Sequence, residues 1–213
     1  MYMPPFFEET RVDVLHDLIR ERPFATVVTR SAAGLEANHI PLMLVPEPLP
    51  YGTLRGHVAR ANAMWSDTVP GSEALCVFHG PDSYISPSWY ATKQESGRVV
   101  PTWNYAVVHA YGPLQPFDDP ARLRELLEAL VARHERRFAA PWSIADAPGD
   151  FIAKMIGGIV GVEVPITRLI GKWKVSQNQP PQNVPGIVQR LRADDPPNPE
   201  MADLVTERAP KPS

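Results

Sequence analysis

The sequence has a single cysteine, which excludes a fold held together by intrachain disulfides. Cys76 lies inside the apolar run ALCVFHG, where a small buried residue is expected rather than a nucleophile. A lone thiol is typical of a reducing compartment, so we expect a cytoplasmic protein. No apolar run reaches the roughly 18 residues of a membrane-spanning helix, and the first residues lack the basic-then-apolar pattern of a signal peptide. We therefore expect no membrane association.

An excess of positive charge is also missing. The chain has 21 Lys and Arg against 24 Asp and Glu, a formal net charge of −3. Nucleic-acid-binding domains are usually basic, so DNA binding would need a local patch. The candidates for such a patch are Arg133, Arg136, Arg137, Arg190 and Arg192. A solvated helix face is the alternative interpretation of the same residues.

Several catalytic and metal-binding motifs are absent. There is no G-x-S-x-G nucleophile elbow and no P-loop, and the six histidines show no paired metal-ligand spacing. We therefore assign no catalytic residue and no metal site. If the protein is an enzyme, Tyr90, His79 and His109 are the candidate acids or bases.

The elements that the sequence does contain are strand-rich, with helices inserted late. Helices are predicted over 9–23, 59–67, 118–138, 149–156, 185–193 and 199–207, and strands over 24–30, 37–46, 53–58, 73–80, 102–114 and twice within 157–177. Strands and helices do not alternate strictly, so a doubly wound parallel sheet is disfavoured. The pattern favours a mainly β, α+β fold: an antiparallel sheet or small barrel with peripheral helices.

The stretch LRGHVARANAMW, residues 54–65, combines a strand end with several cations. We expect Gly56 to end the strand and a helix to open at 57–59, with Arg55, His57 and Arg60 around its start. Free backbone N–H groups at a helix start, together with arginine, form an anion site. The alternative is a plain strand-to-helix junction with solvated arginines.

The stretch GKWKVSQNQ, residues 171–179, places Lys172 and Lys174 on one strand face and Trp173 on the other. Ser176, Gln177 and Asn178 then supply donors and acceptors that either read the edge of a heterocycle or cap nearby backbone. Glu163 occupies an alternating strand position and is expected to face solvent, or to pair with Arg168, Lys172 or Lys174 if it faces inward.

The segment 84–105, YISPSWYATKQESGRVVPTWNY, is unusually aromatic. Its rings either cover the edge of the core or form a wall beside a flat ligand. The polar residues TKQESGR are expected to be a mobile tip, with Trp89 and Trp103 as structural anchors.

The motifs MYMPPFF, GHVARAN, YISPSWY, VPTWNY, GGIVGVEVPI and GKWKVSQN, in this order, resemble the FMN-binding negative transcriptional regulator family from Met1 to about Asn183. The resemblance implies a split β-barrel, a homodimer with FMN at the subunit interface, and a role as a negative transcriptional regulator. It also implies FMN contacts from the motif residues His57, Arg60, Asn62, Ser86, Tyr90, Thr102, Lys174, Gln177 and Asn178.

The resemblance leaves two alternatives open, a flavin-dependent oxidoreductase or flavin reductase-like enzyme, and a split barrel that binds haem instead of FMN. For the domain organisation, we expect a split-barrel domain over residues 1–178 with inserted helices, followed by a helical extension over 179–213.

Overall fold

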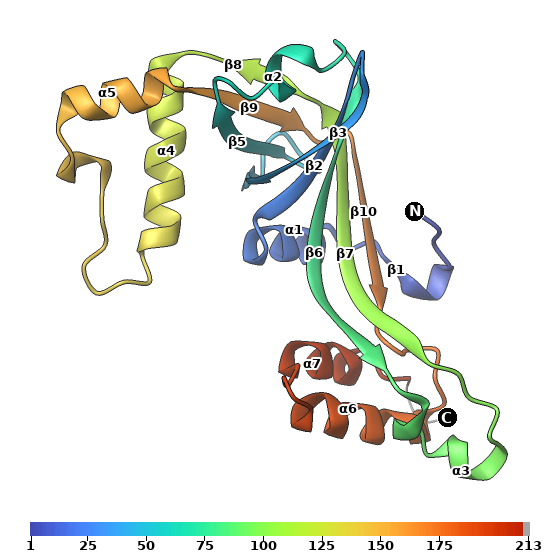
Figure 1. Ribbon diagram of the computed structural model, residues 1–213. Helices are drawn as coiled ribbons and strands as arrows, with labels where there is room; N and C mark the ends of the chain where they lie inside the picture. The colour runs from blue at the N-terminus through green and yellow to red at the C-terminus, as the bar shows by residue number, and fades with distance from the viewer. Residues whose placement is uncertain (211–213) are drawn as a thin grey trace. The chain divides into compact units, whose positions relative to one another are not determined.

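The computed structural model describes residues 1–210 (Figure 1). These residues form two compact units. The first unit consists of residues 1–18, 79–108 and the chain from 170 onward, and the second of residues 19–78 and 109–169. The last three residues of the expected extension over 179–213 lie outside the described part.

Strands β1, β10, β7 and β6 are hydrogen-bonded neighbours in that order, and residues of all four contribute to the first unit. Glu8 and Glu9 of β1 pair antiparallel with Lys172 and Gly171 of β10. The strands are β1 (Glu8–Glu9), β6 (Glu73–Ile85), β7 (Thr102–Pro113) and β10 (Arg168–Lys174). Strands β6, β7 and β10 also contribute residues to the second unit.

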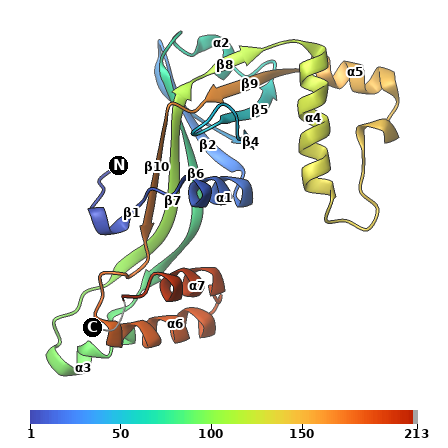
Figure 2. The same cartoon turned by 180° about the vertical axis from the view of Figure 1, so that it is seen from behind.

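The helices of the first unit include the two predicted near the carboxyl end of the chain. They are α1 (Val12–Glu21, to Leu18 in this unit), α3 (Thr92–Ser96), α6 (Val184–Ala193) and α7 (Pro199–Glu207), with short 3-10 turns η1 (Pro5–Phe7), η2 (Pro87–Trp89) and η4 (Pro181–Asn183). Helices α6 and α7 pack side by side, as two views show (Figures 1 and 2). The side chain of Asn198 caps α7 by accepting from the N–H of Met201.

The second unit contains a four-stranded sheet in the order β4, β5, β9, β8, in which the pairs are antiparallel. In the same unit β2 pairs antiparallel with β3 and with the first residues of β6. The strands are β2 (Phe24–Ser31), β3 (Gly34–Pro41), β4 (Met43–Val45), β5 (Thr53–Ala59), β8 (Gln115–Phe117) and β9 (Ile159–Pro165).

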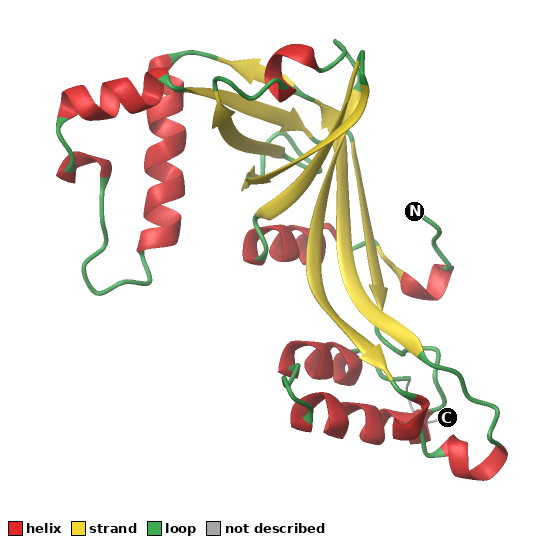
Figure 3. Cartoon of the chain, in the orientation of Figure 1, coloured by secondary structure: helices red, strands yellow, loops and turns green. Residues whose placement is uncertain are grey.

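Helices α4 (Pro120–Glu135) and α5 (Gly149–Gly157) follow β8 and precede β9 along the chain. Like the other helices they are red in Figure 3, which has the orientation of Figure 1. Asp119 caps α4 through the N–H of Arg122, and Pro120 stands at its first position, as predicted. Leu123, Ile144, Ile152 and Ile156 form the shared core of this helical segment, with Phe117 packed against it. The two remaining helical pieces are α2 (Met64–Asp67) and the 3-10 turn η3 (Ile144–Asp146). Within the part of the chain that the structure covers, no helix combines the length and the apolar composition needed to cross a bilayer.

One prediction of local structure is wrong. The chain remains a strand through Gly56 and His57 to Ala59, and the following helix begins only at Met64 and is four residues long. Pairing with β9 extends β5, because His57 lies opposite Gly161 and Ala59 opposite Ile159. No helix start is therefore present at 57–59 to bind an anion.

A buried carboxylate on β1 of the first unit pairs with arginines near both ends of the chain. Glu9 is 4% exposed and pairs with Arg11 (2.8 Å) and with Arg208, just after α7. Burial by itself would raise the pKa of Glu9, but the hydrogen bonds from Arg11 and Arg208 and the charge of Arg208 outweigh it and lower the pKa from 4.5 to about 2.

We therefore predict that Glu9→Gln destabilises the protein by about 2 kcal/mol at neutral pH. Because the pKa of Glu9 is lowered in the folded state, its contribution is complete above about 4.5 and is lost as the pH falls toward about 2. Urea unfolding of both proteins across that pH range measures this. The exposed neighbour Glu8→Gln is the control, and an equal gap at pH 7 and at the acid end would contradict the assignment.

Candidate functional site

Two lysines on β10 define a surface in the first unit that we call the lysine–aromatic face: Lys172, Lys174, Tyr2, Thr102 and Tyr105. The Nζ of Lys172 donates to the carbonyl oxygen of Tyr2 (3.0 Å) and lies 5.3 Å from the ring centre of Tyr105 and 5.7 Å from that of Tyr2. The Nζ of Lys174 contacts the Thr102 hydroxyl and donates to the Trp103 carbonyl oxygen. Both cations thus lie beside neutral acceptors, and Lys172 also lies beside aromatic rings.

Neither lysine has a carboxylate within ion-pair distance among the described residues. Lys172 is only 6% exposed, and Glu8, its partner across the strand pair, forms no ion pair with it. Burial, and then the positive charge of Lys172, lower the pKa of Lys174. Two neighbouring cations without a counter-ion form a site that favours an anion.

The polar residues at the end of β10 are already engaged within the protein. Ser176, at a positive φ of 66°, exchanges hydrogen bonds with Asn104, and both side chains are buried. The side chain of Gln177 donates to the carbonyl oxygens of Phe6 and Trp173 and accepts from the N–H of Val175. The capping role considered for this segment is therefore present, and Asn178 is the exposed member of the group.

The aromatic segment 84–105 is built differently from the expectation. Its tip forms helix α3, which ends at Gly97 with a positive φ of 64°. Trp103 is 56% exposed and packs edge-on against Tyr84, whereas Tyr90 is 4% exposed. Tyr90, rather than Trp103, is the buried aromatic residue of this segment.

Short contacts hold this segment against the helices that follow β10. The Asn183 side chain accepts from the N–H and the hydroxyl of Thr92, both at 3.1 Å. A Cβ added at Gly186 in α6 would lie 2.2 Å from the carbonyl oxygen of Trp89. Ser86 caps the turn η2 by accepting from the N–H of Ser88. Of the FMN contacts predicted in this segment, Thr102 is the residue that contacts Lys174.

The remaining predicted residues, His57, Arg60 and Asn62, belong to the second unit. The Nδ1 atom of His57 is buried without a hydrogen-bond partner, and burial lowers its pKa. Asn62 donates to the side chain of Asn38 (2.8 Å) and accepts from the N–H of Met64 (2.8 Å). Asn62 therefore shapes the loop before α2, whereas His57 has a free ring nitrogen.

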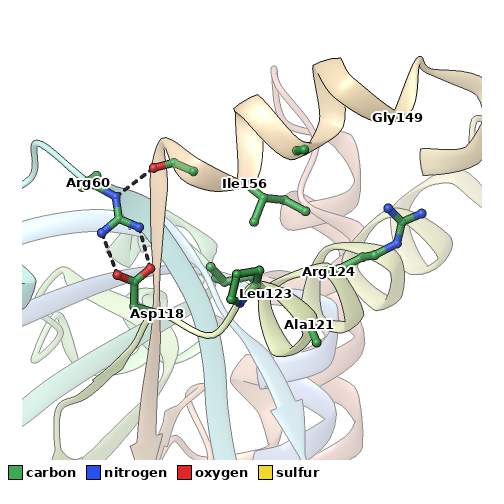
Figure 4. Close-up of a pocket in the computed structure, with 10 residues that line it drawn as sticks. Arg60, Asp118, Ala121, Leu123, Arg124, Gly149 and Ile156 are labelled. Atoms are coloured by element: carbon green, nitrogen blue, oxygen red, sulfur yellow. Dashed lines mark hydrogen bonds and ion pairs between the residues drawn. The ribbon is translucent and has the colours of Figure 1, made fainter.

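Arg60 fastens the loop after β5 to the elements beside it. Its guanidinium forms two hydrogen bonds with Asp118 (2.9 and 2.5 Å) and donates to the carbonyl oxygens of Gly157 (2.8 Å) and Ile159 (3.0 Å), as Figure 4 shows in part. The hydrogen bond from Arg60 holds the pKa of Asp118 below its ordinary value. Most of the guanidinium donors are thus used within the protein.

Arg60 and Asp118 stand at one end of a cleft of about 550 Å³ whose other lining is mostly aliphatic (Figure 4). Leu123 of α4 and Ile156 of α5 form part of its walls. The cleft offers apolar surface beside a neutralised ion pair. A dianion entering there would meet the Asp118 carboxylate beside the arginine.

Glu163 pairs with residues other than those proposed from the sequence. Its carboxylate lies 2.7 Å from Arg55 and 3.0 Å from Arg122, and its side chain is 14% exposed. Arg122 in turn lies over the ring of Phe117 at 4.3 Å. The expectation of a solvent-facing Glu163, or of pairing with Arg168, Lys172 or Lys174, is therefore wrong.

Comparison with known sequences identifies the family. A family described as "Putative FMN-binding domain" matches residues 1–168. The chain belongs to this family. It is 29% identical over 212 residues to Protease synthase and sporulation protein PAI 2 of Bacillus subtilis, covering 99% of both chains. It is also 31% identical over 223 residues to the uncharacterized protein AN0679 of Emericella nidulans, covering 88% of this chain and 89% of that protein.

Solved structures confirm the predicted fold class, antiparallel sheets with peripheral helices in a split-barrel arrangement. The flavocytochrome Anf3 from Azotobacter vinelandii aligns with a TM-score of 0.58 at 11% identity, covering 81% of this chain and 72% of that one. The FAD and heme binding protein from Mycobacterium smegmatis aligns with a TM-score of 0.56 at 17% identity, covering 78% and 73%.

The residues present fit the cofactor after which the FMN-binding domain family is described. FMN combines a dianionic phosphate with a flat ring system, and the lysine–aromatic face offers two unpaired cations, a hydroxyl and aromatic rings. Among residues 1–210, no three His, Cys, Asp or Glu side chains are grouped to hold a metal ion.

Sequence reasoning named Lys174 and Thr102 but left Tyr2 and Tyr105 out of the expected contacts. Strand alternation puts Lys172 on the same face as Lys174, and this is the sequence signal that points to Lys172 as part of the site. Tyr2 joins the face only because β1 pairs with β10, and Tyr2 and Lys172 are 170 residues apart in the sequence. No local sequence pattern predicts the pairing of β1 with β10.

The close approach of α6 to the aromatic segment gives a direct test of the packing there. Gly186→Ala should destabilise the protein by about 1–3 kcal/mol, because its Cβ collides with the backbone oxygen of Trp89. Gly149→Ala is the matched control, since nothing lies within 4 Å of its Cβ. Thermal or urea unfolding measures both, and equal stability of the two variants would show that the approach is looser than described.

Proposed function

We propose that this protein binds FMN at the lysine–aromatic face and acts in gene regulation, the role that the family resemblance implies. Its relative PAI 2 is named a protease synthase and sporulation protein. The observation that carries the FMN assignment is the pair Lys172 and Lys174, which have no carboxylate partner among the described residues and lie beside Tyr2, Tyr105 and Thr102. FMN supplies redox chemistry when bound. The chain supplies positive charge for the phosphate and rings beside which a flat group can lie.

Lys174 is the residue we assign to the phosphate. It is partly exposed, whereas Lys172 is buried and fixed by the Tyr2 carbonyl oxygen. An anion at Lys174 also offsets its repulsion by Lys172, which favours the charged form of Lys174. Arg60, the alternative phosphate ligand, would have to leave the Asp118 carboxylate first.

We also infer a homodimer in a reducing, cytoplasmic environment. The exposed ring pair Tyr84 and Trp103, with centroids 5.9 Å apart, supplies apolar surface for a partner subunit. The compartment inference rests on the single cysteine, which is free and buried.

Lys174→Gln should weaken FMN binding about 10- to 100-fold, the loss expected for a charge-assisted hydrogen bond. Titration followed by flavin fluorescence measures the affinity, and sedimentation of the loaded protein reports whether it is a dimer. Lys93→Gln, which removes an exposed lysine from α3, is the matched control. If haemin addition gives a Soret band and no flavin binding is found, the cofactor assignment changes from FMN to haem.

Arg60→Ala separates the two possible phosphate positions. If Lys174 binds the phosphate, Arg60→Ala lowers stability but leaves FMN affinity within a few-fold of the parent. A large affinity loss in Arg60→Ala with none in Lys174→Gln would move the phosphate to the second unit and contradict our assignment.

For DNA, we propose the arginine pocket of the second unit, lined by Arg20, Arg133, Arg136 and Arg137 with His134. It is a cavity of about 440 Å³ whose one acidic lining residue is Glu21. Arg133 donates to the carbonyl oxygen of Arg20, and Arg137 lies 4.9 Å from the ring centre of Phe138. Local positive charge of this kind fits a phosphodiester backbone although the whole chain is acidic.

Replacing both Arg136 and Arg137 by Gln should weaken promoter DNA binding and lower the slope of log affinity against log salt by about 2. Titrations at about 50 and 200 mM salt measure the slope. The control is the double variant Arg190→Gln, Arg192→Gln on α6, where Arg192 pairs with Asp203. Salt-insensitive binding, or none, would remove direct DNA binding from the proposed function.

A further inference from the structure

A small cavity in the first unit has a buried phenol in its lining. It lies where the turn after η2, helix α3 and the chain before β7 meet the segment after β10, and its volume is about 300 Å³. We call it the Tyr90 cavity. Its lining includes Tyr90, Arg98, Val99, Val100 and Gln179. None of these residues belongs to the lysine–aromatic face.

Tyr90 carries a buried polar group that the protein leaves unsatisfied. The side chain is 4% exposed, and its hydroxyl is buried without a hydrogen-bond partner. Leaving a buried hydroxyl unpaired is costly, so such a group usually meets water or a ligand. Burial, and then the proximity of Tyr84, raise the pKa of Tyr90, which keeps the hydroxyl protonated and able to donate at neutral pH.

The hydroxyls of Thr92 and Ser96, which also line the cavity, already donate and accept hydrogen bonds within the protein. The polar groups left over, on Arg98 and Gln179, are donors. Arg98 has no carboxylate within ion-pair distance among the described residues, and its side chain is exposed to solvent. The carbonyl oxygen of the Gln179 side chain already accepts from Asn183 at 3.2 Å, which leaves its amide hydrogens to donate. Val99 and Val100 add aliphatic surface.

We propose that the Tyr90 cavity binds a small monocarboxylate with a short aliphatic body. A hydroxyl, a guanidinium and an amide that all donate call for an acceptor, and one cation matches one negative charge. The aliphatic lining matches a branched carbon chain, and the volume stands at the lower end of the range for ligand sites. The site is independent of FMN binding, because no residue is shared with the lysine–aromatic face.

The test uses the full-length protein with isovalerate as the charged probe and isovaleramide as its neutral analogue. Saturable binding is expected by nuclear magnetic resonance titration, with isovaleramide weaker. Tyr90→Phe and Arg98→Gln should each weaken isovalerate binding about tenfold or more, since each removes a hydrogen bond to a charged ligand. Tyr84→Phe and Lys93→Gln are the matched controls in the same segment and should bind isovalerate as the parent does.

Two further measurements decide the origin of any binding. Lys174→Gln should leave isovalerate affinity unchanged, and saturating FMN should not displace the probe. Displacement by FMN would make the cavity part of the flavin site and overturn the proposal. Absence of saturation below about 10 mM isovalerate, an affinity weaker than about −3 kcal/mol, or equal binding by Tyr90→Phe, would overturn it as well, without bearing on the FMN assignment.

Discussion

The first unit depends on how its charges are shared along the pairing of β1 with β10. Glu9 is buried and engaged by Arg11 and by Arg208, so its charge is already balanced. Lys172 lies one step along the same ladder, opposite Glu8, and has no ion pair. Arginine takes the buried carboxylate because its several donors can satisfy both oxygens at once. The lysines are left beside carbonyl oxygens and rings, which attract a cation without neutralising it.

The same difference between arginine and lysine separates the two positions considered for a phosphate. Arg60 uses most of its hydrogen-bond donors on Asp118 and on two carbonyl oxygens. The Asp118 carboxylate therefore neutralises the charge of Arg60 before any ligand binds. Lys174 carries a charge that burial and Lys172 both disfavour. An incoming anion gains little at the first position and relieves an existing penalty at the second.

The fold was predictable where the signal is local. Helix α4 is predicted by the cap Asp119, by the proline at its first position and by a stripe of leucines. The structure contains each of these features. The end of β5 was not predictable, because pairing with β9, about a hundred residues further along, decides it. The partners of Glu163 and Arg60 were missed for the same reason, since Arg122 and Asp118 come to them only through the antiparallel sheet and the helical insertion.

The composition of the aromatic segment 84–105 does not predict the surroundings of its individual rings. Its many rings suggested either a cover for the edge of the core or one wall beside a flat ligand, but in the structure the rings have separate surroundings. Tyr105 lies beside Lys172, Tyr84 and Trp103 form an exposed pair, and Tyr90 is buried with a free hydroxyl. Contacts from Asn183 and Gly186 fix the segment against η4 and α6, so these surroundings are set by packing against residues about 90 positions away. An aromatic cluster in a sequence therefore indicates that rings are needed, whereas burial and hydrogen bonding decide which of them can meet a ligand.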